Sequence, residues 1–288
     1  MSISQSDLEY VSQLAYEQAA LVIGPDKDYL VETRLAPLAA QAGCATLSAY
    51  IRKLRHEPRV NGIHHRAVEA LTTNETFFFR DYQPFEALRR HVLPALLRQR
   101  AGTRRLTIWS AACSTGQEPY SLAMLLREHF PELAKGWTVT ILATDLVPAI
   151  VEQARKGRYT QFEVNRGLPA SYLIKYFKQD RDGWQVNGEI KQMIDFREMN
   201  LIQPWPILPA FDVVLLRNVM IYFDVETKKT ILKKVRTCLL PHGYLFLGTA
   251  ETTTNLDLEY QPVTFDKAVA YCLAGAVGED VVEAAGAI

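Results

Sequence analysis

Residues 104–130 constrain the fold of this chain more strongly than any other stretch. Residues 106–110 are a short apolar run that is typical of a buried strand. Small residues follow at 111–116, where the backbone can approach a ligand closely, and 118–130 has apolar residues at helical spacing. A strand, a small-residue turn and a helix predict the opening unit of a doubly wound sheet, with a ligand at the carboxyl end of the strand.

Strands and helices alternate along the rest of the chain after residue 104. Apolar runs alternating with helices predict an α/β fold with a mostly parallel, Rossmann-like sheet that is covered on both faces. A final hairpin should add an antiparallel edge strand. The expected strands are 106–110, 139–145, 193–198, 211–217, 243–249, 262–265 and 268–273, and the expected helices between them are 118–130, 147–156 and 226–239.

Residues 158–192 interrupt this alternation with short polar and aromatic runs. Asp182-Gly183 and Asn187-Gly188 are each typical of a hairpin corner. We therefore predict a small antiparallel β-subdomain inserted at about 158–198. The small acidic tail at 275–288 is expected to fray.

The first 71 residues predict helices only. Ser6-Asp7-Leu8-Glu9 is typical of a capping box, and Gly24-Pro25 should end the first helix. We expect an all-helical amino-terminal domain with its linker at 1–74 and a second domain at 75–288. Further helices are expected at about 28–42, 47–56, 60–71 and 82–99.

Composition narrows the class of protein. The chain has 288 residues, of which 48% are hydrophobic and 22% charged, as in ordinary globular proteins. Residues 51–105 contain twelve Lys and Arg against five acids, and this basic stretch either faces an acidic partner or forms solvated helix faces. Four scattered cysteines without C-x-x-C argue against disulfides and structural zinc, so we expect no metal. No secretion signal or membrane-length apolar run is visible, so we expect a cytoplasmic protein without membrane insertion.

The small-residue turn favours a nucleoside ligand without a pyrophosphate, such as S-adenosylmethionine. It contains Gly116 but neither a full G-x-G-x-x-G nor a G-K-[ST]. Asp145 ends the second strand, where an acidic residue either accepts from ribose hydroxyls or caps the next helix. Glu118 begins the first helix, and the helix dipole is an alternative reason for a carboxylate there.

Polar residues also flank an aromatic run and two further strand ends. Three phenylalanines at 77–79 are most simply a hydrophobic plug between two domains, whereas their polar neighbours need partners if they are buried. Asn200-Leu201 ends the third strand, and Arg217-Asn218 follows the fourth. Tyr222 comes shortly after and is either aromatic packing or a reacting group.

Together these stretches resemble the chemotaxis receptor protein-glutamate O-methyltransferase family (CheR type). The matching stretches lie between Thr72 and Ala270 and include TTNETFFFRD, WSAACSTGQEPYSLAM, FDVVLLRNVMIYFD and LPHGYLFLGTAE. The resemblance implies transfer of a methyl group from S-adenosylmethionine to glutamate side chains on chemoreceptor signalling domains. The product of the cofactor would be S-adenosylhomocysteine.

The resemblance also implies the residues of the site. It places Arg80 and Tyr222 near the transferred methyl, the inserted β-subdomain at a receptor-docking surface, and the basic helices toward the receptor. In place of the family's usual G-H-S-E, this chain has Gly248-Thr249-Ala250-Glu251. The implied cofactor contacts are Asn74, Thr76, Arg80, Glu118, Asp145, Asn200, Leu201, Asn218 and Val219.

Two other functions stay open on the sequence. A methyltransferase of small molecules or nucleic acid is disfavoured, because Asn218-Val219-Met220-Ile221 stands where an amine-methylating N-P-P-Y motif would be. The second alternative is a non-catalytic module that senses S-adenosylmethionine or docks to a receptor. We expect a monomer that does not bind nucleic acid.

Overall fold

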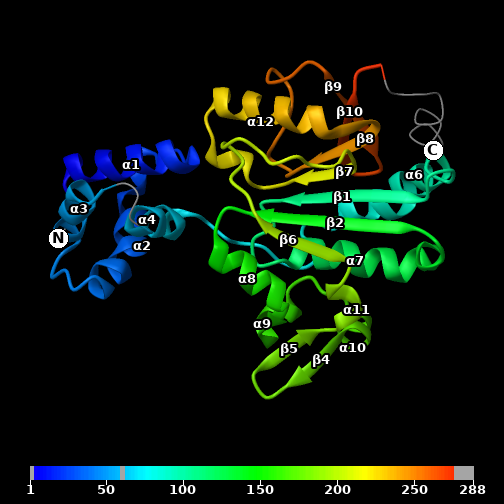
Figure 1. Ribbon diagram of the computed structural model, residues 1–288, viewed down its shortest axis with the longest axis horizontal. Coiled ribbons are helices and arrows are strands. Elements are labelled where there is room, and N and C mark those ends of the chain that lie inside the picture. The colour runs from blue at the N-terminus through cyan, green and yellow to red at the C-terminus, as the bar shows by residue number, and fades with distance from the viewer. Residues whose placement is uncertain (1–2, 59–61, 276–288) are drawn as a thin grey trace. The chain divides into compact units, whose positions relative to one another are not determined.

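The computed structural model describes residues 3–58 and 62–275. The tail that was expected to fray lies outside the described residues from residue 276 on. By their contacts, the residues form two compact units (Figure 1). The smaller unit contains Met1–Asn74 and the separate segment Tyr222–Thr227. The larger unit contains Glu75–Ile221 and Lys228–Ile288.

The amino-terminal part of the smaller unit is helical, as predicted. Apolar side chains such as Val11, Val31 and Ile51 pack into one core there. Ser4 is the N-cap of the first helix, because its side-chain oxygen accepts a hydrogen bond from Asp7 N, so the capping box predicted at Ser6 is wrong. The helices are α1 (Gln5–Ala19), η1 (Pro25–Lys27), α2 (Asp28–Gln41), α3 (Leu47–His56) and α4 (Gly62–Leu71).

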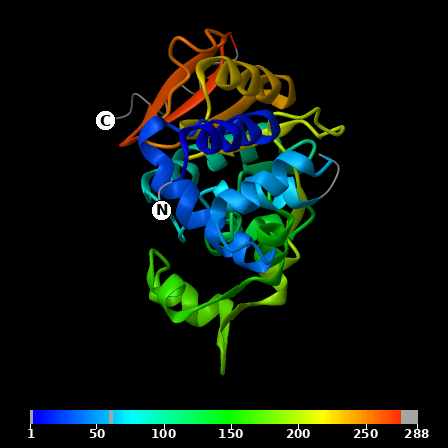
Figure 2. The ribbon, with the colours of Figure 1, turned by 90° about the vertical axis from the view of Figure 1, so that its left-hand side faces the viewer.

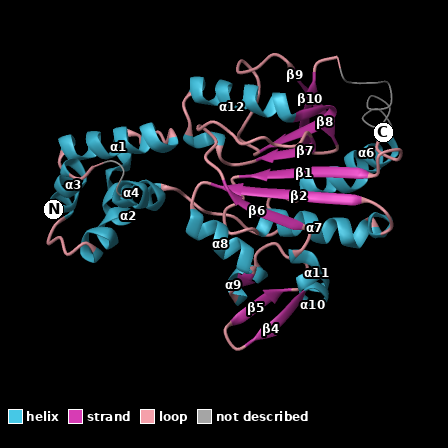
Figure 3. Ribbon diagram, viewed as in Figure 1, coloured by secondary structure: helices cyan, strands magenta, loops and turns pink. Residues whose placement is uncertain are grey.

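The larger unit is built on a seven-stranded sheet in the order β6-β2-β1-β7-β8-β10-β9 (Figure 3). Strands β6, β2, β1, β7 and β8 pair in parallel, and β10 is antiparallel to both of its neighbours. The predicted fold class is therefore confirmed, including the antiparallel hairpin. The strands are β1 (Arg105–Ala111), β2 (Thr138–Asp145), β6 (Ile194–Glu198), β7 (Phe211–Leu216), β8 (Leu239–Leu247), β9 (Tyr260–Phe265) and β10 (Ala268–Leu273).

Helices cover both faces of this sheet. The path β1–α7–β2–α8–β6 runs in one direction along the sheet, whereas β7–α12–β8 runs in the other. Right-handed crossovers therefore place α12 on the face opposite α7 and α8. The helices are α5 (Gln83–Ala87), a π-helical turn (Leu88–Val92), α6 (Leu93–Gln99), α7 (Gln117–His129), η3 (Pro131–Ala134), α8 (Pro148–Lys156), η4 (Met220–Tyr222) and α12 (Val225–Cys238).

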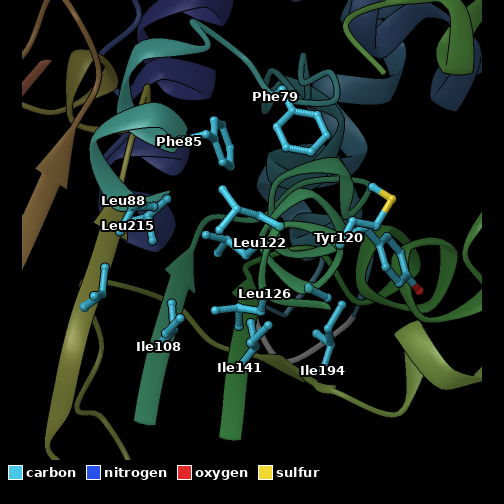
Figure 4. Close-up of a cluster of buried hydrophobic side chains, with 14 of the residues drawn as sticks. Phe79, Phe85, Leu88, Ile108, Tyr120, Leu122, Leu126, Ile141, Ile194 and Leu215 are labelled. Atoms are coloured by element: carbon cyan, nitrogen blue, oxygen red, sulfur yellow. The ribbon is translucent and has the colours of Figure 1, made fainter. Parts of the chain in front are cut away.

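Figure 4 shows the core between α7 and the sheet. Ile108, Ile141 and Leu215 project from β1, β2 and β7 toward Leu122 and Leu126 of α7, and all five are buried. This arrangement follows from the two-residue period of strands and the helical spacing in α7.

The phenylalanine run joins the same core. Phe78 packs edge-on against Tyr159, and Phe79 packs edge-on against Phe85. These two side chains therefore belong to the interior of the larger unit, which corrects the expectation of a plug between two domains.

The insertion forms a three-stranded sheet in the order β3-β5-β4, which stands off the main sheet (Figures 1 and 2). Its hairpin turns at Arg181-Asp182, and Gly183 begins the next strand, so the predicted corner is present one residue earlier than expected. The corner predicted at Asn187-Gly188 is wrong, because Asn187 instead precedes a short helix. The elements are β3 (Arg158–Tyr159), α9 (Gln161–Asn165), α10 (Ala170–Tyr176), β4 (Phe177–Asp180), β5 (Gly183–Val186) and α11 (Gly188–Lys191). No helix in the described part of the chain has both the length and the hydrophobicity needed to cross a bilayer.

Candidate active site

The carboxyl ends of four adjacent parallel strands lie along one edge of the main sheet. Asn200 and Leu201 follow β6, and Asp145 ends β2. The small-residue turn follows β1, and Asn218 comes two residues after β7. The fold thus brings four distant stretches of predicted site residues to neighbouring positions, where ligands of doubly wound sheets bind.

The turn after β1 is tightly packed. Ala112, Ser114 and Gly116 have φ angles of 55°, 50° and 93°, in the left-handed region. A Cβ at residue 116 would lie 3.0 Å from Ala154 Cβ and 3.1 Å from Tyr159 Oη, so both the backbone and the available space favour glycine there. The Tyr159 hydroxyl also donates to Thr115 O at 2.7 Å, which fixes the turn against its neighbours.

Asp145 is only 6% exposed, and backbone N–H groups hold its carboxylate. Its Oδ2 accepts from Ser114 N at 2.8 Å, and its Oδ1 accepts from Val147 N at 3.2 Å. Burial raises the pKa of Asp145, and these N–H donors partly oppose that shift. Val147 is the N-cap residue of α8, so the helix-capping alternative for Asp145 is wrong. Each carboxylate oxygen keeps further acceptor capacity, which suits ribose hydroxyls.

Glu118 and Arg217 form a buried network at the start of α7. Glu118 Oε1 accepts from the Ser110 hydroxyl at 2.7 Å, and its Oε2 accepts from Arg217 Nη1 at 2.9 Å. The Arg217 side chain is 1% exposed and also donates through Nη2 to Asp81 Oδ2 and Arg80 O, each at 2.8 Å. Arg217 therefore ties the end of β7 to α7 and to the turn that carries Arg80. The role of Arg217 was not predicted from the sequence, although an arginine directly after an apolar strand is a usable signal.

Arg80 is half-buried and lies in a backbone of unusual conformation. Phe79, Asp81 and Tyr82 all have positive φ angles, between 49° and 65°. Arg80 Nη1 donates to Glu75 O at 2.8 Å, and the guanidinium lies 5.6 Å from the centre of the Phe77 ring. This bond uses one of the five guanidinium N–H donors, so the group retains donors for a carboxylate.

Lys234 holds the loop after β6. Its Nζ donates to the carbonyl oxygens of Leu201, Ile202 and Gln203 at 3.1, 3.1 and 2.8 Å. Burial lowers the pKa of this lysine. Asn200 Oδ1 accepts from Ile202 N at 3.1 Å. The loop is therefore held both by Lys234 and by a hydrogen bond within itself. Nothing in the local sequence distinguished Lys234 from the other lysines of α12.

The remaining predicted residues divide between the two units. Thr76 belongs to the larger unit, whereas Asn74 and Tyr222 belong to the smaller one. Asn74 Nδ2 donates to Thr72 Oγ1 at 3.2 Å, and Tyr222 O accepts from Val22 N at 2.9 Å. Across the described ranges, no group of three or more His, Cys, Asp and Glu is placed to hold a metal ion.

Two family models match this chain. The CheR methyltransferase SAM binding domain matches residues 74–269, and the CheR methyltransferase all-alpha domain matches residues 6–72. The chain is 39% identical to chemotaxis protein methyltransferase 1 of Pseudomonas aeruginosa and 37% identical to chemotaxis protein methyltransferase Cher2 of Pseudomonas putida. It is also 37% identical to a chemotaxis protein methyltransferase of Vibrio parahaemolyticus. Each of these matches covers 94% of this chain and 99% of the relative.

Proposed function

Because this chain belongs to the CheR methyltransferase family, we propose that it methylates glutamate side chains of chemoreceptor signalling domains to form methyl esters for sensory adaptation. Residues 74–269 are its S-adenosylmethionine-binding methyltransferase domain, so the predicted family, enzyme class and cofactor are confirmed. The observation that supports this choice of substrate is the match over nearly the full length of proteins named chemotaxis protein methyltransferases.

The residues at the carboxyl edge of the sheet fit this cofactor. Asp145 would accept hydrogen bonds from the ribose hydroxyls. The tight turn at Gly116 would lie against the nucleoside, which carries no phosphate group and therefore needs no phosphate-binding loop. The full set proposed to contact the cofactor is Asn74, Thr76, Arg80, Glu118, Asp145, Asn200, Leu201, Asn218 and Val219.

The acceptor carboxylate needs little activation. A glutamate side chain has a reference pKa of about 4.3 and is therefore ionised at neutral pH, so no general base is required. When bound, S-adenosylmethionine supplies an electrophilic methyl group. Arg80 would orient the acceptor carboxylate through its free guanidinium donors, and Tyr222 would fix it with a hydrogen bond.

The partner follows from the same proposal. The cytoplasmic signalling domain of a chemoreceptor would be the substrate, which places the enzyme in the cytoplasm. We propose that it acts as a monomer and has no nucleic-acid partner.

A labelling experiment tests the substrate class. The purified protein, methyl-labelled S-adenosylmethionine and membranes containing chemoreceptors are incubated, and the labelled receptor band is treated with mild base. Release of volatile methanol is expected, because carboxyl methyl esters are base-labile. Base-stable label would indicate a nitrogen or ether acceptor and overturn the proposal. Cofactor binding without label on any receptor would favour the non-catalytic sensing or docking module.

A further inference from the structure

One carboxylate holds the loop that follows β7. Glu251 Oε2 accepts from Asn218 N at 2.8 Å and from Gly248 N at 2.7 Å, and Glu251 Oε1 accepts from Ile221 N at 3.2 Å. Three backbone donors from two separate segments thus converge on one side chain. All four residues belong to the larger unit.

The loop has backbone groups that need such a partner. Asn218 has a φ of 58°, in the left-handed region, and the short helix η4 begins at Met220. The first N–H groups of a helix have no acceptor within it, and Ile221 N is one of them. A carboxylate satisfies these donors with charge-assisted hydrogen bonds, which are stronger than bonds between neutral groups.

Gly248 packs closely against the same loop. A Cβ at residue 248 would lie 2.8 Å from Asn218 N and 2.7 Å from Asn218 Nδ2, closer than real Cβ contacts. Only glycine therefore allows the end of β8 to approach Asn218 this closely. The turn that follows, closed by a 2.9 Å bond from Glu251 N to Gly248 O, brings the Glu251 side chain back onto the loop.

We propose that Glu251 is a positioning residue of the cofactor site. By accepting from Asn218 N and Ile221 N, and from Gly248 N in its own turn, it fixes the backbone of Asn218–Ile221 at two points and presents Asn218 and Val219 to S-adenosylmethionine. This inference rests on the proposed cofactor contacts of Asn218 and Val219. It gives a role to the last residue of Gly248-Thr249-Ala250-Glu251, which stands at the glutamate of the family's usual G-H-S-E, whereas Thr249 and Ala250 depart from that pattern.

Replacing the carboxylate by an amide separates this role from simple packing. In Glu251→Gln, one oxygen still accepts, but an NH₂ group faces the backbone donors on the other side. Glu251→Ala removes all three bonds. Affinity for S-adenosylhomocysteine should therefore fall less in Glu251→Gln, by about tenfold, than in Glu251→Ala, by about a hundredfold.

The measurement is titration calorimetry with S-adenosylhomocysteine, at a temperature where thermal unfolding shows each variant to be folded. Glu259→Gln is the matched control. The Glu259 side chain is 61% exposed and its Oε2 lies 3.9 Å from Arg236 Nη1, so affinity should stay at the wild-type value. If Glu251→Ala does not fold, Glu251→Gln decides alone.

Three results would overturn the inference. The first is wild-type affinity in folded Glu251 variants, which would leave Glu251 only a structural role. The second is an equal loss in Glu259→Gln. The third is wild-type affinity in Asn218→Ala together with Val219→Ala, which would remove the premise. Because no receptor is present, failure to methylate chemoreceptors would refute the proposed substrate without changing this outcome.

Discussion

At the scale of single residues, three charged side chains of the larger unit bind to backbone atoms of loops at or near the candidate site. Asp145 accepts from two backbone N–H groups, Glu251 accepts from three, and Lys234 donates to three carbonyl oxygens. Each such side chain orders a loop and is itself ordered by it. This mutual support is what a site needs to hold a ligand in one geometry.

The pKa of Asp145 predicts a pH dependence of cofactor binding. Because burial raises this pKa above the usual value of about 3.9, the free protein takes up the proton at a higher pH than an ordinary aspartate. The protonated group is a poorer acceptor for ribose hydroxyls, so affinity for S-adenosylhomocysteine should fall as the pH is lowered from about 7.5 to about 4.5. Calorimetry across this range measures the effect.

Asp145→Ala provides the comparison. Its affinity at neutral pH should be weaker than that of the wild type, and its pH dependence over the same range should be flatter. An equally steep curve in the variant would assign the titration to another group.

Arg80 is predicted to be the residue with the largest effect on turnover. Arg80→Ala should lower the rate of receptor methylation at least about a hundredfold, as is typical when a transition-state contact is lost. Arg166→Ala is the matched control, because that guanidinium lies 4.3 Å from the centre of the same Phe77 ring and has no proposed role in catalysis. A near-wild-type rate in Arg80→Ala, or an equal loss in both variants, would contradict the assignment.

At the scale of secondary-structure elements, Arg217 joins three parts of the larger unit. It follows β7, pairs with Glu118 at the start of α7, and binds the carboxylate and carbonyl of the turn at residues 80–81. A guanidinium suits this position because its fixed fork of donors reaches several acceptors at once.

Arg217→Met should destabilise the protein strongly. The substitution keeps apolar volume beside Phe85 but leaves the buried Glu118 carboxylate without its cation. We expect a loss of about 3 kcal/mol in the free energy of unfolding, measured by urea denaturation. The exposed pair of Arg197 and Asp195 gives the control, since Arg197→Met should cost less than about 1 kcal/mol. Equal, small losses in both variants would refute a structural role for the Arg217 network.

At the scale of the whole molecule, the segment Tyr222–Thr227 is distant in sequence from the rest of the smaller unit. Val22 N donates to Tyr222 O at 2.9 Å, and the Tyr16 hydroxyl donates to Asp224 Oδ2 at 2.6 Å. Asp224 Oδ1 also accepts from Thr227 N at 2.7 Å, within the first turn of α12. Residues of the amino-terminal helical part thus hold the segment that begins with Tyr222.

Tyr16→Phe should therefore lower turnover without changing cofactor affinity. The variant removes only the hydroxyl that binds Asp224, so Tyr222, for which we propose a role in holding the acceptor, loses one indirect support, and methylation should slow several-fold. Initial rates of receptor methylation and calorimetry with S-adenosylhomocysteine measure the two effects separately. Tyr29→Phe, at a tyrosine that is 63% exposed on α2, should match the wild type in both. A wild-type rate in Tyr16→Phe would contradict the prediction.

The fold class and the family could be predicted from local sequence patterns. Strand and helix periodicities are local properties, so the alternation after residue 104 was sufficient to predict the doubly wound sheet and its closing hairpin, and its interruption at 158–192 predicted the inserted β-subdomain. Because neighbouring strands of such a sheet are parallel, the carboxyl ends of β6, β2, β1 and β7 lie at one edge. The motifs around Gly116 and Asn218 identified the family.

The side chains that support the site could be identified only from the packed chain. Glu251 meets Asn218 across 33 residues of sequence, and Arg217 meets Glu118 across 99. The same holds for the buried phenylalanines at 78–79, whose partners lie elsewhere in the larger unit. The physical reason is that a hydrogen bond or ion pair depends on distance in space. Local patterns show that a polar group needs a partner, and only the packed chain selects that partner.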